Sequence, residues 1–207
     1  MAETEDRPRN RTRTEETILA AAKQVLADQG FAGWGVNGIA RAAGCDKQLI
    51  YRYFGGLDGL AEAIGEDVAA WLEEALSARP DQPPAATYAE LATRLLLEFM
   101  DALRANPLAQ KIIAWEVAEE SPLVKRFATA RGRVMMAWIL RERGELVPPA
   151  GVDIFAVNAL LVAGVQHLVL AGAASGSFAA IDLTQDTNWE RIRAAVLTMA
   201  TAAYAPG

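Results

Sequence analysis

The feature of this sequence that most constrains its fold is residues 31–54, which read FAGWGVNGIARAAGCDKQLIYRYF. Over residues 36–43, apolar side chains recur at i, i+3, i+4 and i+7, which places them on one face of a helix. Gly44 follows at the position where helices commonly end in left-handed backbone. Asp46 can then cap a second helix by accepting hydrogen bonds from the free backbone amides that follow it. The pattern therefore predicts two short helices around a tight turn, a helix-turn-helix.

The second predicted helix has an outer face that suits nucleic acid. Ile50 and Phe54 lie four residues apart and are expected to pack inward on Ile39. On the outer face, Lys and Arg can pair with phosphate or guanine, Gln with adenine, Leu with a thymine methyl group, and Tyr hydroxyls with phosphate. A solvated surface helix would show similar residues, but a helix of about two turns is unstable alone and needs a scaffold. The candidate DNA-binding residues on this helix are Lys47, Gln48, Leu49, Tyr51, Arg52 and Tyr53.

Three motifs follow one another in the first third of the chain: ILAAAKQVLADQGF at residues 18–31, IARAAG at 39–44 and LIYRYF at 49–54. In this order they resemble the N-terminal domain of the tetracycline-repressor (TetR) family of bacterial transcriptional regulators, over roughly residues 12–64. The resemblance implies an all-α fold of about nine helices. It has an N-terminal three-helix helix-turn-helix domain and a C-terminal helical domain for ligand binding and dimerisation.

The sequence predicts the following division of the chain. We expect a disordered basic arm at residues 1–11, a helix-turn-helix DNA-binding domain at 12–56, and a ligand-binding and dimerisation domain at 57–207. The net charge is −6, but residues 7–54 carry eight Lys and Arg against four Asp and Glu. Positive charge is therefore concentrated where DNA is expected to lie.

Two positions depart from the family's pattern. Gly35, preceded by Trp34, stands where a Ser or Thr N-cap is usual. Any phosphate contact there is therefore expected from a backbone N–H or from the indole, and both residues join the candidate DNA-binding set. Leu57 stands where a lysine usually follows the recognition helix, which removes one expected phosphate contact.

A competing motif occupies the same region. Gly33, Gly35 and Gly38 spell G-x-G-x-x-G, and Asp58 lies twenty residues beyond the last glycine, as in a dinucleotide-binding fingerprint. That fingerprint requires a buried strand immediately upstream, whereas the upstream segment here has a helical pattern. We therefore do not expect dinucleotide binding.

The titratable residues do not favour an enzyme or a metalloprotein. The chain has one cysteine and one histidine, which excludes an intramolecular disulfide and a conventional His/Cys zinc site. Glu116, Glu119, Glu120 and His167 are acid–base candidates, but no nucleophile–base pairing or cofactor loop accompanies them. We expect no catalytic residues, metal or cofactor. The polar N-terminus lacks a secretory signal pattern, so we expect a cytoplasmic protein.

Residues 154–174 contain no Asp, Glu, Lys or Arg. The length would suit a membrane span, but Asn158, Gln166 and His167 interrupt it, and no Lys or Arg between Arg143 and Arg191 would orient it. A helix that is apolar all round also suits a dimer core, and together with the last helix it would form the four-helix interface typical of the family. The expected interface residues are Ala156, Ala159, Ala163, Gly164, Ile192 and Val196.

The C-terminal domain contains large adaptable side chains that could line an effector pocket. Most such residues simply form the core, but Glu116 and His167 are polar groups within apolar helical runs, and buried polar groups need partners. An apolar ligand with a polar or cationic group would suit this set. The candidate pocket residues are Trp71, Phe99, Trp115, Glu116, Met135, Trp138 and His167.

The sequence thus favours a ligand-responsive transcriptional regulator, a repressor in the leading hypothesis. It would bind a palindromic double-stranded DNA operator as a homodimer and be released by a small-molecule effector. The resemblance implies that the signal passes through the helix expected at residues 58–78. Two alternatives remain: a ligand-binding module that has lost DNA recognition, suggested by Leu57 and Gly35, and an enzyme.

Overall fold

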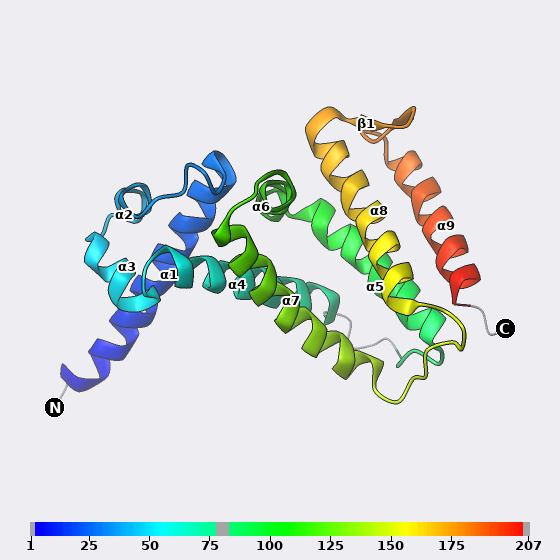
Figure 1. The fold of residues 1–207 in the computed structure, drawn as a ribbon, viewed down its shortest axis with the longest axis horizontal. Helices are drawn as coiled ribbons and strands as arrows, with labels where there is room; N and C mark the ends of the chain where they lie inside the picture. Colours follow the sequence, from blue (N-terminus) through cyan, green and yellow to red (C-terminus); the bar gives the residue numbers. More distant parts are fainter. Residues whose placement is uncertain (1–2, 78–82, 205–207) are drawn as a thin grey trace. The chain divides into compact units, whose positions relative to one another are not determined.

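The computed structural model describes residues 3–77 and 83–204, with the side chains of residues 3–10 excepted. These ranges contain nine α-helices and one two-stranded antiparallel sheet (Figure 1). The elements are α1 (Glu3–Gln29), α2 (Val36–Ala43), α3 (Lys47–Phe54), α4 (Leu57–Ser77), α5 (Tyr88–Ala105), α6 (Pro107–Ala118), α7 (Pro122–Arg143), α8 (Ile154–Ser175), β1 (Ser177–Phe178), β2 (Ile181–Asp182) and α9 (Asp186–Ala203). The prediction of an all-α fold of about nine helices is confirmed.

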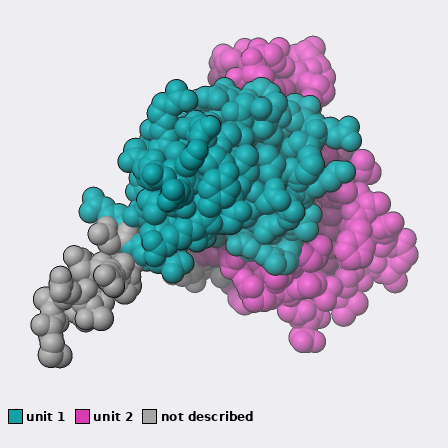
Figure 2. All heavy atoms as spheres, turned by 60° about the vertical axis from the view of Figure 1, so that its left-hand side comes forward, with its two compact units in different colours: residues 1–70, 111–135 teal, residues 71–110, 136–207 magenta. Residues whose placement is uncertain are grey.

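The chain divides into two compact units (Figure 2). The first unit comprises residues 1–70 and 111–135, and the second comprises residues 71–110 and 136–207. The division falls within α4, α6 and α7, whereas the sequence predicts a single boundary after residue 56. Residues 111–135 join the first unit because their side chains contact residues that are distant in the sequence. A local sequence pattern does not reveal such contacts.

The helix ends follow the predicted local chemistry. Gly44 has φ +64°, and its amide donates to the carbonyl oxygens of Ala40 and Arg41, which closes α2. Asp46 caps α3, since one of its carboxylate oxygens accepts the Gln48 amide at 2.8 Å. These are contacts between near neighbours in sequence, so the sequence alone predicts them.

The start of α1 differs from the prediction. The helix begins at Glu3 and includes residues that we expect to form a disordered arm, because the predicted DNA-binding domain begins at residue 12. Arg11 Nε pairs with Glu15 Oε1 at 2.8 Å across one helical turn. Extending an existing helix costs much less than nucleating one, so the helix continues past the predicted boundary.

The hairpin between α8 and α9 was not predicted. Ala179 and Ala180 form its two-residue turn with φ +46° and +63°, and Phe178 pairs with Ile181. Turns of this kind usually carry Asn-Gly or Asp-Gly, which tolerate positive φ. An Ala-Ala turn gives no such signal in the sequence.

The core of the first unit joins the helix-turn-helix to α1. Ile18, Leu26, Ile39 and Ile50 are all fully buried. They come from α1, α2 and α3, and burial of each large aliphatic side chain contributes about 1.5–3 kcal/mol. The short recognition helix is therefore held by a scaffold, as its length requires.

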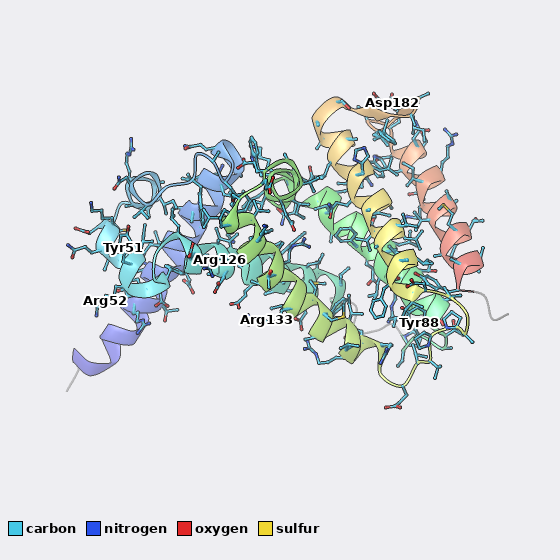
Figure 3. All side chains as sticks on the ribbon, in the orientation of Figure 1. Tyr51, Arg52, Tyr88, Arg126, Arg133 and Asp182 are labelled. Carbon is cyan, nitrogen blue, oxygen red and sulfur yellow. The ribbon has the colours of Figure 1, made fainter. Side chains whose placement is uncertain are left out.

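In the first unit, α4 and α7 approach closely. A Cβ added at Gly65 of α4 would lie 2.4 Å from the Phe127 carbonyl oxygen of α7. Arg126, which Figure 3 labels on α7, pairs with Asp58 and Glu62 of α4, each at 2.9 Å. A glycine thus permits the contact between the backbones, and exposed ion pairs lie beside it.

In the second unit, α5 packs with α8 and α9. Trp189 of α9 is buried, and its indole Nε1 donates to the Leu183 carbonyl oxygen at 2.8 Å. Asn158 of α8 bridges two tyrosines: its amide nitrogen donates to Tyr88, and its amide oxygen accepts from Tyr204. Burial raises the pKa of Tyr204 to about 12.

Candidate nucleic-acid interface

The structure gathers all six candidate residues of α3 on one short helix. Lys47, Gln48, Tyr51 and Arg52 are exposed, and Tyr51 reaches 56% exposure although it is a large aromatic residue. Leu49 and Tyr53 are half-buried. Ile50 is fully buried on the opposite side, which fixes the direction in which the other side chains point. Figure 3 labels Tyr51 and Arg52 on this helix.

Two arginines flank the Tyr53 ring. The Arg52 guanidinium carbon lies 5.8 Å from the ring centroid, and that of Arg11 lies 5.5 Å from it. Such cation–π contacts hold positive charge against an aromatic face. A hydrogen bond to Glu15, reinforced by its negative charge, raises the pKa of Arg11 above its ordinary value. Arg11 thus adds a cation beside α3, where the prediction placed it only in the basic arm.

Trp34 is a correction to the candidate set. Its side chain is 3% exposed, and its indole Nε1 donates to the Ala22 carbonyl oxygen at 2.9 Å. Phe31 packs edge-on against it, with ring centroids 6.1 Å apart. The indole N–H is therefore used inside the first unit and is not available for a phosphate group.

Gly35 occupies the predicted N-cap position of α2. Its backbone is extended, with φ −137° and ψ 149°, and it makes no side-chain cap bond. A Cβ added there would have no neighbour within 4 Å, so a serine would fit. The Gly35 carbonyl oxygen accepts the Ile39 amide at 3.0 Å. Leu57, the other departure from the pattern, is the half-buried first residue of α4.

Cys45 lies in the turn between α2 and α3. It is half-buried, and burial, together with the negative charge of Asp46, raises the pKa of its thiol. The neutral thiol is therefore favoured at this site.

The predicted pocket residues do not form one site within either unit. Trp115, Glu116 and Met135 belong to the first unit, whereas Trp71, Phe99, Trp138 and His167 belong to the second. A single effector pocket built from these seven residues therefore stays a prediction.

Several of these side chains already have structural partners. Trp115 donates to the Ala27 carbonyl oxygen at 3.2 Å, and Glu116 pairs with Arg131 at 2.6 Å. Trp138 is buried and donates to Ser77. His167 is exposed and packs edge-on against Phe178, with ring centroids 4.7 Å apart. The indole N–H groups of Trp115 and Trp138 therefore have partners inside the protein, whereas Glu116 Oε2 is buried without a hydrogen-bond partner among the described residues.

The second unit contains two cavities of about 540 and 510 Å³, which none of the predicted pocket residues lines. The larger one lies between the end of α4, α5 and the end of α7, and Leu76, Leu95, Arg143 and Leu146 contribute to its wall. The smaller one lies between α5 and α9. Arg94 and the buried Glu98 of α5 line both cavities.

The predicted interface residues divide between exposed and buried positions. Ala156, Ala159, Ala163 and Gly164 of α8 are exposed. Ile192 and Val196 of α9, however, are only 6% and 7% exposed, because that face of α9 packs within the second unit. The outward apolar residues of α9 are instead Leu197 and Met199, at 49% and 58% exposure.

Helix α8 leaves a large apolar surface uncovered. Phe155 and Leu160 are 71% and 75% exposed. In the described part of the chain, α8 alone is long and apolar enough to cross a membrane, with a mean hydropathy of 2.0 over a window that is 11% buried. Within that same part, no group of three or more His, Cys, Asp or Glu side chains could hold a metal ion.

Residues 18–64 match the family model described as "Bacterial regulatory proteins, tetR family". A curated relative, the HTH-type transcriptional regulator BetI 2 of Chromohalobacter salexigens, is 28% identical over 140 residues, which is 65% of this chain. The matched segments span 66% of that relative's length and 51% of the length of an uncharacterized HTH-type transcriptional regulator of Mycobacterium tuberculosis.

Solved structures share the fold over nearly the whole chain. A TetR family transcription regulator from Marinobacter aquaeolei has a TM-score of 0.65 at 19% identity, covering 96% of this chain and 100% of that one. The transcriptional regulator FadR from Bacillus subtilis, solved with stearoyl-CoA, has a TM-score of 0.66 at 17% identity, covering 91% of this chain and 98% of that one. The segment at residues 18–64, which includes the capped and exposed α3 helix, is thus similar to the tetR family of bacterial regulatory proteins, and the fold of the chain is similar to that of these solved structures.

Proposed function

We propose that this protein is a transcriptional regulator that binds a palindromic double-stranded DNA operator as a homodimer and releases it when a small molecule binds the second unit. The observation that carries the proposal is α3, whose capped helix exposes Lys47, Gln48, Tyr51 and Arg52 while Ile50 anchors it in the core. Cations supply phosphate contacts and Gln supplies a base contact in such helices. Repression of transcription, rather than activation, is the leading hypothesis. DNA binding implies a cytoplasmic location.

The exposed apolar face of α8 supports the homodimer. Contiguous apolar surface of this kind usually marks an interaction site. Small residues at Ala156, Ala159, Ala163 and Gly164 would allow a second copy of α8 to approach closely. On α9 we replace Ile192 and Val196 with the exposed Leu197 and Met199 as the expected interface positions. A second copy thus explains the apolarity of α8 without a membrane.

The two cavities of the second unit support an effector site. Arg94 and Glu98 of α5 line both cavities, and each cavity also has leucine side chains in its wall. Apolar surface combined with a few polar groups is typical of small-molecule sites. FadR, whose fold is similar, binds stearoyl-CoA. We propose that an effector with both an apolar and a polar part occupies one of these cavities. It acts by binding the DNA-incompetent state more tightly than the competent one.

The proposal is tested by selecting bound duplexes from a random double-stranded DNA pool at about 150 mM salt, where purely electrostatic binding is weak. We expect a palindrome to be recovered by the native protein, and Arg52→Ala to abolish its recovery. Lys125→Ala, at an exposed cation of the first unit outside α3, serves as the charge-matched control and should leave the selection unchanged. Recovery of background sequences only would reject sequence-specific regulation and favour a ligand-binding module without DNA recognition.

A further inference from the structure

We propose that Glu119, directly after α6, is a positioning residue for the DNA-reading helices, because its carboxylate holds the backbone that leads from α1 into α2. The inference rests on the proposed function, since it assigns a role in orienting α3 for DNA. It concerns contacts inside the first unit only, where Glu119, α1 and α2 all lie.

The contact uses both carboxylate oxygens. Glu119 Oε1 accepts the Phe31 amide at 3.1 Å, and Oε2 accepts the Ala32 amide at 2.7 Å. Consecutive backbone N–H groups next to a left-handed residue form a concave site for anions, and Gly30 supplies that residue with φ +68°. A carboxylate is therefore the side chain best suited to hold this segment, and its bonds are strengthened by the negative charge.

Gly30 leaves room for this carboxylate because glycine has no side chain. A Cβ at Gly30 would lie 2.0 Å from Glu119 Oε1 and 2.9 Å from two ring atoms of Trp115. Both distances are far below van der Waals contact, and the positive φ already disfavours other residues. The end of α1 is thus built for the close approach of α6 as well as for a helix stop.

Glu119 belongs to a row of three contacts along one face of α6. Trp115 Nε1 donates to the Ala27 carbonyl oxygen at 3.2 Å, and Lys111 Nζ lies 3.4 Å from Asp28 Oδ1. Residues 111, 115 and 119 recur every four positions, so they lie on one side. Lys111 and Trp115 contact the last turn of α1, and Glu119 contacts the segment that follows it. The Glu119 amide donates to the Trp115 carbonyl oxygen at 3.0 Å, which keeps Glu119 in register with the helix.

The held segment determines how α2 leaves α1. Phe31 packs edge-on against both Trp34 and Phe127, with ring centroids 6.1 and 5.9 Å apart, and residue 36 begins α2. A shift of the Phe31 and Ala32 backbone would therefore be passed to α2 and α3.

The test compares Glu119→Gln with Glu120→Gln, which removes the same charge from the adjacent exposed residue. In Glu119→Gln the side-chain amide can accept one backbone N–H but opposes the other with its own donor. We expect hydrogen exchange of the Phe31 and Ala32 amides to become about tenfold faster, since a charge-assisted bond is lost. Glu120→Gln should leave both rates unchanged. Unchanged rates in Glu119→Gln would overturn the proposal.

The second readout is the ratio of affinities for the selected palindrome and for a scrambled duplex of the same length. Misorientation of α3 lowers only the specific affinity, so we expect the ratio to fall about tenfold in Glu119→Gln at an unchanged salt dependence. A lower fraction of folded protein would reduce the apparent affinity for both duplexes equally and leave the ratio unchanged. An unchanged ratio would therefore also overturn the proposal.

Trp115→Phe provides an independent variant that keeps the ring but removes the indole N–H, and it should lower the same ratio in the same direction. If the native protein selects no palindrome, the proposed function fails. The exchange rates of Phe31 and Ala32 then still show whether the Glu119 contact forms, so the two failures are distinguishable.

Discussion

Trp34 and Ala22 are joined by a buried hydrogen bond from the indole Nε1 to the Ala22 carbonyl oxygen, 2.9 Å long. This bond fastens the segment before α2 to the middle of α1. It explains why Trp34, which the sequence suggests as a phosphate contact, acts in the scaffold instead.

Trp34→Phe should lower the free energy of unfolding by about 1–2 kcal/mol, because it keeps most of the ring volume and loses one hydrogen bond. The DNA affinity of the folded protein should stay within about twofold of native, because the indole N–H is already used inside the first unit. A twofold change corresponds to only a few tenths of a kcal/mol. Urea denaturation and fluorescence anisotropy with the selected duplex measure the two quantities. A large loss of affinity at native stability would restore Trp34 to the DNA interface.

Gly65→Ala and Gly132→Ala make a matched pair in α4 and α7. The added methyl group at Gly65 would meet the Phe127 carbonyl oxygen at 2.4 Å, whereas at Gly132 it would meet nothing within 4 Å. We expect Gly65→Ala to destabilise the protein by about 1–3 kcal/mol through overpacking. Gly132→Ala should stabilise it by up to about 1 kcal/mol, because alanine favours the helix. Thermal unfolding measures both, and equal effects would contradict the close approach of α4 and α7.

Tyr204 should make stability fall at high pH. Burial favours its neutral phenol and raises the pKa to about 12, whereas the unfolded chain has the ordinary value near 10. Its stabilising contribution is therefore complete below pH 10 and is lost as the pH rises from 10 through 12. Ultraviolet titration of phenolate should show a late ionisation step near pH 12. In Tyr204→Phe this late step should disappear, and a titration unchanged from native would contradict the assignment.

Leu160→Glu should dissociate the homodimer. Leu160 is 75% exposed on α8, so the substitution places a charge on the proposed interface with little cost to the single chain. Val117→Glu on α6 is the control, because Val117 is 71% exposed outside that surface. Sedimentation velocity should show a monomer for the first variant and native behaviour for the second. A dimer that survives Leu160→Glu would place the interface elsewhere.

Gln48→Ala should relax base preference at one position of each half-site. A bidentate Gln–adenine contact is worth about 1–3 kcal/mol of discrimination. Lys47→Ala should instead weaken all duplexes similarly and reduce the salt slope by about one. Repeating the duplex selection with each variant separates the two roles. If only Lys47→Ala lost the base preference, Lys47 rather than Gln48 would be the residue that contacts the base.

The recognition helix and its caps could be predicted from the sequence because their contacts are local. Asp46 accepts the Gln48 amide only two residues along the chain, and Gly44 closes α2 through carbonyl oxygens three and four residues before it. The hairpin at Ala179 and Ala180 escaped prediction, because its positive φ angles fall on residues that give no turn signal.

The cavities of the second unit and the burial of both predicted α9 interface positions, Ile192 and Val196, could not be predicted in this way. Large aromatic side chains look alike in a sequence whether they line a cavity or fill the core. Trp138 fills the core, and Ile192 faces α5 rather than outward. Periodicity indicates that one helix face is apolar, but both the core and a partner subunit can cover such a face.

The sequence by itself determined the order of the helices, the ends of α2 and α3 and the residues displayed by α3, since these depend on contacts within about one helical turn. Only the tertiary structure decided which of the displayed residues are free and which have partners. Glu119 reads in the sequence as an exposed helix end, yet its carboxylate holds the Phe31 amide from 88 residues away. Contacts at that separation depend on how α1 and α6 pack, and that packing is set by many side chains together rather than by any local pattern.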